Sequence, residues 1–600
     1  MSNRQGAERT ELFNHEGHEK ARRKNLKTFV SLRALRGKFS WRSSRLGGSL
    51  KNWLPALAFL ALFFFYPLVK ILTLGVDSPD FFSPQALEIA AGSLGFTLWQ
   101  AFLSMLLTLG VGLPAAYLFA HYDFRGKALL RALTAVPFML PTVVVAAGFN
   151  ALLGPRGWLN LSLMRTFSLD SPPINVLYTL GAILLAHVFY NTTIVIRVVG
   201  NALSRIDPRL NEAAQMLGAN RWRAFWTVTF PLLRPSILAA ALLVFLFDFT
   251  SFGVILLLGG AKFATLEVEI FVQTMSMLNL PVAALLSLIQ LLCTLAFSVL
   301  YSKALERANV RTQREVVVIT RRAKSLPERL FLLSSFLLLF TLFILPMLAL
   351  PLRSVSQLEA ARGDRSTLET GFTDDYYQEL FINRRGSRFY VPPIHAAANS
   401  LQYAGITVLL SLLLGFPVAS ALAKPTRLDR ALDPFLMLPL GASAVTLGLG
   451  FIIAFSRPPL NWISSPLLVP LAHTMIALPF VIRSLQPALA SIPQRYREAA
   501  AMLGASPFWV WWTVDFPIIS RATLAAATFA FTVSLGEFGA TSLLARPEYP
   551  TIPTAIYRFL SQPGGLNYGQ AMAMATILMV LTTISILLIE KLRLTGAGEW

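Results

Sequence analysis

The stretch EAAQMLGANRWRAFWTVTFP (212–231) recurs later in the chain as EAAAMLGASPFWVWWTVDFP (498–517). Twelve of the twenty aligned residues are identical, at a constant offset of 286 (212 + 286 = 498). Each copy opens with helix-forming residues, is interrupted by a glycine, continues with aromatic residues and stops at a proline. Both copies stand between long apolar runs. The pattern predicts a membrane protein that carries the same water-exposed docking surface twice.

The composition indicates that the chain is embedded in a membrane. Of its 600 residues 55% are hydrophobic and only 14% are charged, a balance that would leave a soluble protein with large sticky surfaces. The net charge of +21 does not indicate nucleic-acid binding, because the excess Lys and Arg flank the apolar runs, where they set orientation. The one cysteine, Cys293, excludes an internal disulfide. Since P-loop, zinc-hydrolase and serine-hydrolase motifs are missing, we expect no enzyme activity, no metal site and no cofactor site.

Twelve apolar runs are long enough to cross a bilayer, which takes about 20 residues as a helix. In the first half they are 53–76, 95–120, 129–153, 176–203, 235–259 and 281–303. In the second half they are 330–352, 396–423, 431–455, 464–490, 520–545 and 568–590. The runs divide the chain into a basic tail (1–52), a first half (53–303), a basic linker (304–329) and a second half (330–600) with a long external loop (353–395).

The repeat extends beyond the two quoted stretches. The segment 187–271 aligns without a gap on 473–557 at the same offset. Six spans per half keep both copies in the same orientation, so the halves form a parallel repeat. Lys and Arg gather in the tail, the linker and the first repeated stretch, which places that side, with both termini, in the cytoplasm. The sequence therefore predicts an all-α membrane protein of about twelve transmembrane helices in two parallel, pseudo-symmetric six-helix halves.

The repeated pattern, Glu-Ala-Ala, three residues, Gly and a closing Pro, resembles the signature of binding-protein-dependent ABC importer permeases. Because the pattern occurs twice, the chain is similar to two permease subunits fused into one polypeptide. FTSFGVILLLGG (249–260) and SLGEFGATSLLARP (534–547) are similar to thiamine and ferric iron permeases, and SLGEFGAT (534–541) also resembles sulfate and molybdate permeases. The resemblance implies the type I ABC importer permease fold and the passage of a small solute, with thiamine or ferric iron favoured.

The resemblance also implies partners. In that family the repeated loop is a coupling helix that sits in a cleft of an ATP-binding subunit. We therefore expect two ATP-binding subunits, with ATP and Mg bound there and no cofactor in this chain. An external solute-binding protein would deliver the solute to this inner-membrane subunit, and no nucleic acid is expected as a partner. The residues implied in docking are Glu212, Ala213, Ala214 and Gly218 in one copy and Glu498, Ala499, Ala500 and Gly504 in the other.

Several residues allow more than one interpretation. Asp248 and Glu537 lie in or beside apolar runs, where an acid at the bilayer centre costs about 2.5–3.5 kcal/mol. We predict a position on the translocation path for both, with a place near the lipid headgroups as the alternative. His187 and His473 are equivalent in the repeat, which favours packing or hydrogen bonding over metal ligation. The bulky residues after each glycine form either an anchor for a partner or an interfacial aromatic belt: Trp222, Phe225, Trp226, Phe508, Trp509, Trp511 and Trp512.

Two other classes of function remain open. An ion-gradient-driven secondary transporter can have the same parallel six-plus-six layout, and it would need no ATPase. A polytopic membrane enzyme would need a polar cluster within the membrane, whereas the ionisable residues of the apolar runs are scattered. Uptake by the chain alone in proteoliposomes would favour the secondary transporter.

Overall fold

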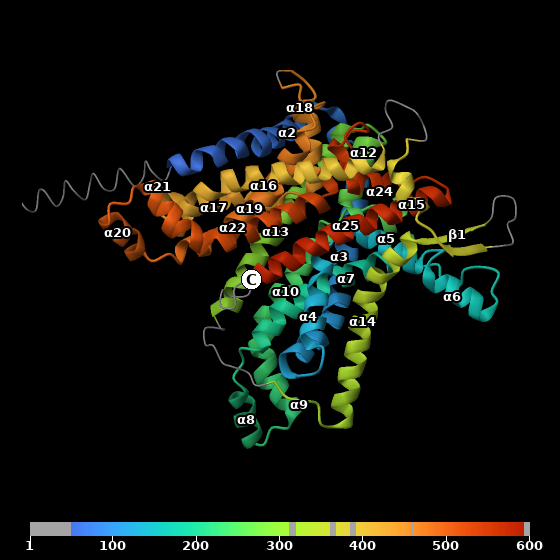
Figure 1. The fold of residues 1–600 in the computed structure, drawn as a ribbon, viewed down its shortest axis with the longest axis horizontal. Coiled ribbons are helices and arrows are strands. Elements are labelled where there is room, and N and C mark those ends of the chain that lie inside the picture. The colour runs from blue at the N-terminus through green and yellow to red at the C-terminus, as the bar shows by residue number, and fades with distance from the viewer. Residues whose placement is uncertain (1–49, 311–319, 361–367, 384–391, 459, 593–600) are drawn as a thin grey trace, which may run out of the picture.

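The protein is a helical membrane protein, seen here in a computed structural model that describes residues 50–310, 320–360, 368–383, 392–458 and 460–592. Ten helices in this part of the chain are long and apolar enough to cross a membrane, or up to twelve if each of two bent helix pairs counts as one span. The predicted all-α membrane fold with about twelve spans is therefore confirmed (Figure 1).

The helices follow the order of the predicted spans, with short helices between them. The first half contains α2 (Tyr66–Asp77), α3 (Pro84–His121), α4 (Lys127–Ala135), α5 (Thr142–Leu153), α6 (Trp158–Phe167), α7 (Leu180–Leu203), α8 (Pro208–Met216), α9 (Arg221–Ala224), α10 (Phe230–Phe249), α11 (Gly253–Leu258), α12 (Leu266–Met275) and α13 (Leu280–Val310). The second half contains α14 (Leu326–Ser354), β1 (Ser356–Ala360), β2 (Leu368–Phe372), α15 (Asp375–Gln378), α16 (Pro393–Ala423), α17 (Arg427–Gly441), α18 (Ala444–Phe455), α19 (Leu468–Ala490), α20 (Gln494–Met502), α21 (Pro507–Val510), α22 (Phe516–Gly536), α23 (Gly539–Leu544), α24 (Ile552–Leu560) and α25 (Gly565–Leu592).

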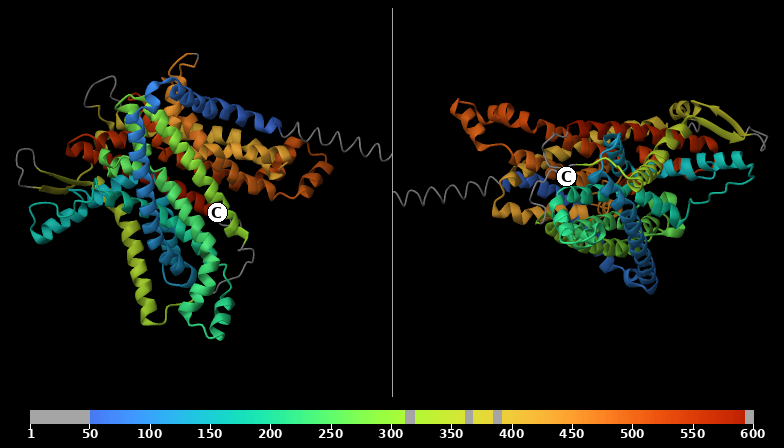
Figure 2. Two further views of the ribbon diagram at one scale, coloured as in Figure 1. Left: turned by 180° about the vertical axis from the view of Figure 1, so that it is seen from behind. Right: turned by 90° about the horizontal axis from the view of Figure 1, so that it is seen from below.

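The two halves form two helical arms that meet at one end and diverge toward the other (Figures 1 and 2). In the first arm α3, α7 and α10 pack together, and in the second arm α16, α19 and α22 pack in the same way. Helices α8 and α9 lie at the free tip of the first arm, and α20 and α21 lie at the free tip of the second (Figure 1). The repeated stretches of the sequence therefore mark the two separate tips of the molecule.

The first long helix of each half packs on the opposite half. The helix Leu50–Gly75 lies along α18 of the second half. The indole Nε1 of its Trp53 donates a hydrogen bond to Oδ1 of Asp429, in α17, at 2.8 Å. In return α14 packs on α5 of the first half, and the ring of Phe331 lies edge-on to that of Tyr117. The predicted division into halves thus describes the order of the chain, whereas in space each half is completed by the first helix of the other.

Two of the predicted spans are sharply bent, which their apolar composition did not reveal. The run 129–153 folds as a helix pair bent by 113°, and the run 431–455 as a pair bent by 91°. In the first pair Pro137 and Pro141 interrupt the helix, because proline lacks the backbone N–H that the helix needs. In the second pair the hydroxyl of Ser443 accepts from a backbone N–H and starts the new helix α18.

Two further predicted spans stop short of their predicted ends. The run 235–259 is divided between α10 and α11, and the run 520–545 between α22 and α23. The two interruptions, 250–252 and 537–538, are named here the first and the second break. They occupy equivalent positions in the repeat, because 252 + 286 = 538. Apolar composition cannot reveal such breaks, since the residues remain apolar on both sides of them.

The described part of the long loop predicted at 353–395 lies at the end where the arms meet, with its two strands projecting from the body (Figure 1). Its strands β1 and β2 pair as an antiparallel hairpin. Tyr376 is buried against Gly569 of α25. A β-carbon at position 569 would overlap the tyrosine ring, so only glycine fits there. The hydroxyl of Tyr377 lies 2.8 Å from that of Ser354, at the end of α14. The described part of the loop is therefore anchored to two long helices.

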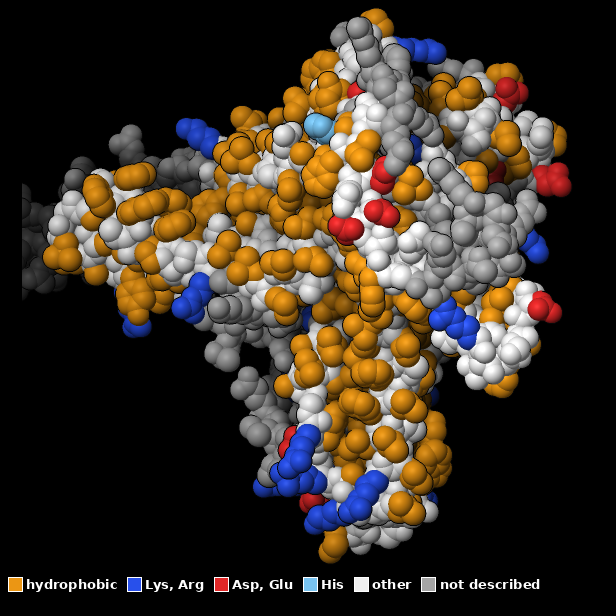
Figure 3. Space-filling model, turned by 45° about the vertical axis from the view of Figure 1, so that its right-hand side comes forward, with side chains coloured by type: hydrophobic (Ala, Val, Ile, Leu, Met, Phe, Trp, Pro, Cys, Tyr) orange, Lys and Arg blue, Asp and Glu red, His pale blue; other side chains and the backbone are white. Residues whose placement is uncertain are grey.

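The surface of the molecule agrees with a membrane location. Apolar side chains cover the sides of both arms, and Lys and Arg gather at the tip of the first arm (Figure 3). The end of the basic linker is fixed near this tip, because the backbone N–H of Arg321 donates to the carbonyl of His121 at 2.9 Å. The predicted basic tail (1–52) lies outside the described residues except for its last three.

Candidate functional site

The first candidate site is the loop at the tip of the first arm, which we name docking loop 1 (207–229). Pro208 starts α8, and the carboxylate of Asp207 accepts from the backbone N–H of Arg209 at 3.0 Å. Helix α8 ends at Met216 and is followed by Gly218, whose φ of +87° lies in the left-handed region that favours glycine. The side chain of Asn220 then accepts from the backbone N–H of Arg223 at 2.7 Å and starts α9.

Docking loop 2 (493–515) at the second tip has the same design. Helix α20 ends at Met502 and is followed by Gly504, with φ of +83°. The hydroxyl of Ser506 then accepts from the backbone N–H of Trp509 at 3.4 Å to start α21. A β-carbon at either glycine would meet nothing within 4 Å. The glycines therefore provide the turn, and the space in front of them is open to a partner.

The base of each loop is tied to the helix that follows it. In loop 1 the hydroxyl of Thr229 donates to Oδ1 of Asn211 at 3.0 Å, and in loop 2 the guanidinium of Arg497 donates to Oδ1 of Asp515 at 2.8 Å. The two pairs are equivalent in the repeat, although their chemistry differs. Each following helix also opens with a π-helical turn at the same position, 225–229 and 511–515. A force on either loop can therefore be transmitted to the span behind it.

The predicted docking residues lie on these loops and face outward. Glu212, Ala213, Glu498 and Ala499 are exposed, as are both glycines, while Ala214 and Ala500 are half-buried. The aromatic residues that follow form a mutually packed and partly exposed cluster, for example Trp222 and Trp226 with ring centroids 5.7 Å apart. Both interpretations of these aromatics, a partner anchor and an interfacial belt, fit this placement.

The apex of each loop is an apolar pair that sequence reasoning did not single out. The exposed fractions are 89% for Met216 and 90% for Leu217, and 88% for Met502 and 89% for Leu503. Apolar side chains so fully exposed, twice and at equivalent positions, are typical of a surface that contacts another molecule. The signal was available in the sequence, since Met-Leu is identical in both copies and directly precedes the glycine.

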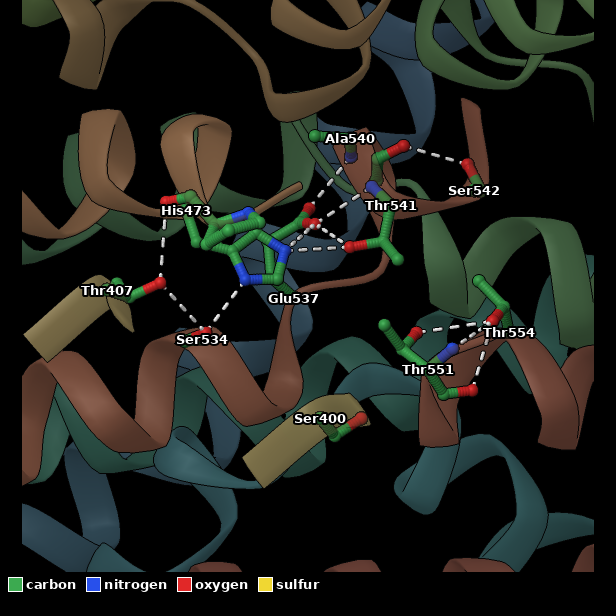
Figure 4. Close-up of polar contacts among 12 residues, drawn as sticks. Ser400, Thr407, His473, Ser534, Glu537, Ala540, Thr541, Ser542, Thr551 and Thr554 are labelled. Carbon is green, nitrogen blue, oxygen red and sulfur yellow. Dashed lines mark hydrogen bonds and ion pairs between the residues drawn. The ribbon is translucent and has the colours of Figure 1, made fainter. Parts of the chain in front are cut away.

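A buried polar centre lies beside the second break (Figure 4). His473 of α19 places Nδ1 2.7 Å from the hydroxyl of Ser534 and Nε2 2.8 Å from the hydroxyl of Thr541. The carboxylate of Glu537 lies 3.2 Å from the same Nε2. It also accepts from the backbone N–H groups of Ala540 and Thr541 at 2.8 and 3.0 Å, and from the Thr541 hydroxyl at 2.6 Å. The break is thus held by an almost fully bonded carboxylate.

The first break has an equivalent centre with a different arrangement. His187 of α7 places Nδ1 2.9 Å from the hydroxyl of Ser104 and 3.4 Å from Oδ1 of Asp248, and Nε2 2.8 Å from the hydroxyl of Ser251. Asn191 donates to Oδ1 of Asp248 at 2.6 Å, whereas Oδ2 of Asp248 has no partner among the described residues. The hydrogen-bonding role predicted for the two histidines is confirmed.

The acid and the hydroxyl have exchanged places between the two centres. Asp248 is equivalent to Ser534 (248 + 286 = 534), and Ser251 is equivalent to Glu537 (251 + 286 = 537). The carboxylate therefore approaches Nδ1 of the histidine in the first half and Nε2 in the second. Each acid is buried beside the histidine of its own half, and a role on the translocation path stays a prediction for both.

A third buried acid was not predicted from the sequence. Glu267, in the first turn of α12, is fully buried; its Oε1 accepts from Gln290 at 2.9 Å and its Oε2 has no partner in the described chain. The signal that could have found it is a carboxylate directly after an apolar residue in a short helix between two spans. Within the described ranges no group of three or more His, Cys, Asp or Glu could hold a metal ion.

The comparison with known families decides what kind of protein carries these loops. The model of the family described as "Binding-protein-dependent transport system inner membrane component" matches residues 108–307 and again residues 411–593, together well over half of the chain. The chain belongs to this family. The permease is therefore a multi-pass inner-membrane protein whose family consists of transport proteins rather than enzymes.

Individual relatives match the permease over most of its length. The "Thiamine transport system permease protein ThiP" of Escherichia coli is 28% identical over 512 residues, which cover 83% of this chain and 88% of the relative. The protein of the same name from Brucella abortus is 27% identical, with 83% and 86% covered. The "Probable ABC transporter permease protein y4fN" of Sinorhizobium fredii is 25% identical, with 84% and 88% covered. The match spans both arms, so the permease resembles these relatives as a fused two-half protein.

Proposed function

We propose that this permease is the membrane-spanning subunit of an ATP-driven importer that carries thiamine into the cytoplasm. Two of the three relatives described above are named as thiamine permeases, and they match both halves of the chain. The sequence pattern alone also fitted ferric iron, and the relatives favour thiamine over it. The observation that carries the coupling to ATP is the pair of like-built loops with fully exposed Met-Leu apices.

Two ATP-binding subunits dock on the two loops in this proposal. The apolar apex of each loop enters a groove of one subunit, and the flanking Glu212 and Glu498 lie at the rim of that contact. ATP and Mg are bound by those subunits, and the permease itself performs no catalysis and holds no cofactor. The ties at the base of each loop carry the movement of the ATP-binding subunits to α10 and α22.

The tips of the arms face the cytoplasm in this proposal, with both termini and the linker 304–329 on the same side. The excess of Lys and Arg at these positions supports that orientation. The opposite end, where the arms meet and the loop 353–395 is packed, then faces outward. A solute-binding protein delivers thiamine at that end.

The test is uptake of radiolabelled thiamine by proteoliposomes that contain the permease, its ATP-binding subunits and, on the outside, its solute-binding protein. Gly218→Trp and Gly504→Trp each lower ATP-dependent uptake at least about tenfold, the effect of losing about 1.4 kcal/mol of docking energy. Both variants also lose co-purification of the ATP-binding subunits.

Gly126→Trp is the matched control, because Gly126 has the same backbone conformation (φ +85°), equally open surroundings and a position outside the docking loops. It retains uptake. Wild-type uptake in the Gly218 and Gly504 variants would refute docking. Uptake by the permease alone, driven by an ion gradient, would replace the proposal with the secondary transporter, and uptake of ferric iron instead of thiamine would correct the solute.

A further inference from the structure

The two breaks meet face to face at the boundary between the arms. The rings of Phe252 and Phe538 are stacked, with centroids 5.5 Å apart and planes 24° apart. These residues are equivalent in the repeat, because 252 + 286 = 538. A residue that contacts its own equivalent lies on the axis that relates the two copies. The stacked pair therefore lies on the pseudo-two-fold axis of the permease.

A second pair of rings extends the stack symmetrically. Phe271 of α12 lies against Phe252 with centroids 5.4 Å apart, and Tyr557 of α24 lies against Phe538 at 5.5 Å. The two contacts have the same interplanar angle of 56°, and 271 + 286 = 557. The four rings form one row across the axis, which we name the aromatic row (Phe271, Phe252, Phe538, Tyr557).

The backbone around the aromatic row is packed too closely to leave a passage. A β-carbon added at Gly253 would lie 3.1 Å from Cδ1 of Phe538 and against the side chain of Thr142, which begins α5 after the bend. A β-carbon at the equivalent Gly539 would lie 2.9 Å from that of Ala444, which begins α18 after the other bend. Each bent pair thus presses on the break of its own arm, and the central rings are buried.

The two arms also contact each other close to this row. Across the boundary, Gly536 of the second arm packs against Pro141 of the first, where an added β-carbon would lie 3.2 Å from the proline ring. Toward the docking loops the arms diverge (Figures 1 and 2). The arms are therefore in contact at the end away from the docking loops.

We propose that the aromatic row is the gate of the solute path, and that solute passes only when Phe252 and Phe538 separate. The inference rests on the proposed function, because it takes the path to run along the axis between the arms. His187 and His473 are positioning residues in this scheme. His473 bonds to Ser534 before the second break and to Thr541 after it, and His187 bonds to Ser251 within the first break. Both histidines therefore hold the backbone next to the two phenylalanines.

The test is passive leak, which requires neither ATP nor partner proteins. Liposomes that contain the permease alone are loaded with radiolabelled thiamine, and efflux is followed without ATP-binding subunits or solute-binding protein. The double variant Phe252→Ala/Phe538→Ala releases thiamine at least about tenfold faster than wild type, the change in rate given by about 1.4 kcal/mol off the barrier. Phe252→Tyr keeps a ring at the axis and stays tight.

Phe480→Ala is the matched control. Phe480 also belongs to a ring pair, with Phe529 at 5.0 Å, but this pair lies within the second arm between α19 and α22. The control stays as tight as wild type. A double variant that is monodisperse, inserted and no leakier than wild type would overturn the gate. ATP-driven uptake is measured in a separate experiment. A failure of the proposed thiamine import would therefore leave the leak result valid, and a failure of the gate would leave the uptake result valid.

A cross-link tests whether the two positions have to separate. Because Cys293 is the only cysteine, F252C and F538C can be paired in a Cys293→Ser background and joined by a short thiol-reactive cross-linker that contains a disulfide. Cross-linking the pair stops ATP-driven uptake, and reduction restores it to the level of the same double-cysteine variant before cross-linking. Undiminished uptake by fully cross-linked permease would overturn the proposal, because the two positions would then not need to separate.

Discussion

The two arms agree closely at their exposed tips and differ at their buried centres. The docking loops repeat the same residues, the same left-handed glycine and the same exposed Met-Leu apex. The buried centres keep one histidine each but exchange the places of the acid and the hydroxyl. If a partner binds the tips as proposed, that contact fixes the identity of their residues, whereas a buried network requires only that its groups find hydrogen-bond partners.

The two centres also differ in how completely they are bonded. Glu537 receives two backbone hydrogen bonds, a hydroxyl and an imidazole, while Oδ2 of Asp248 has no partner in the part of the chain described. A buried carboxylate with every lone pair engaged stabilises its surroundings more than one left partly unpaired. We therefore expect the second break to be the more rigidly held of the two.

The largest expected effect tests the equivalence of the tips. Leu217→Glu and Leu503→Glu each place a charge in the apolar apex, and each lowers ATP-dependent uptake about tenfold or more, the effect of losing at least 1.4 kcal/mol of docking energy. Leu326→Glu is the control, since Leu326 is also exposed but starts α14, where an acid favours the helix. If one tip tolerates the charge, the two loops do not dock equivalently.

The next effect compares the two acids. Glu537→Ala leaves the imidazole of His473 and two backbone N–H groups without their carboxylate, and costs about 3–5 kcal/mol of stability. Asp248→Ala removes the oxygen to which Asn191 donates, together with one oxygen that has no partner among the described residues. It costs about 1–3 kcal/mol of stability. Thermal unfolding in detergent ranks the two variants. A larger loss for the Asp248 variant would reverse the comparison of the centres.

A smaller effect is expected when the first centre is converted to the pattern of the second. Asp248→Ser and Ser251→Glu each cost about 1–3 kcal/mol alone, because each leaves buried polar groups mismatched. The double variant regains at least half of the summed loss, because both positions contact the same imidazole and their effects do not add. With His187→Ala added, the recovery disappears. If the stability losses of Asp248→Ser and Ser251→Glu simply add, the acid and the hydroxyl do not compensate for each other in this centre.

The smallest effect concerns the bases of the loops. Arg497→Ala breaks the partly exposed ion pair with Asp515, and Asn211→Ala breaks the hydrogen bond with Thr229. Each costs about 0.2–1 kcal/mol, since the pairs are small and near solvent. Thermal unfolding shows a shift of a few degrees at most for both. A large shift for one alone would show that the two loops are not tied down alike.

Much of the fold was predictable because its signals are local. Apolar runs of the right length gave the spans, and a constant offset gave the two halves and their docking loops. Glycine between two short helices was sufficient to predict the turn at Gly218 and Gly504. The bends at 137–141 and 441–443 were missed, because the chain stays apolar through them and a length criterion does not register a change of direction.

The sequence by itself determined the class of protein, the duplication and the residues presented at the two tips, since these depend on composition and spacing along the chain. Only the tertiary structure decided which residues meet across the arms. Trp53 reaches Asp429 across 376 positions, and Phe252 stacks on its own repeat equivalent Phe538. Such contacts depend on how helices cross and which faces they bury, and neither property is carried by the order of residues within one helix.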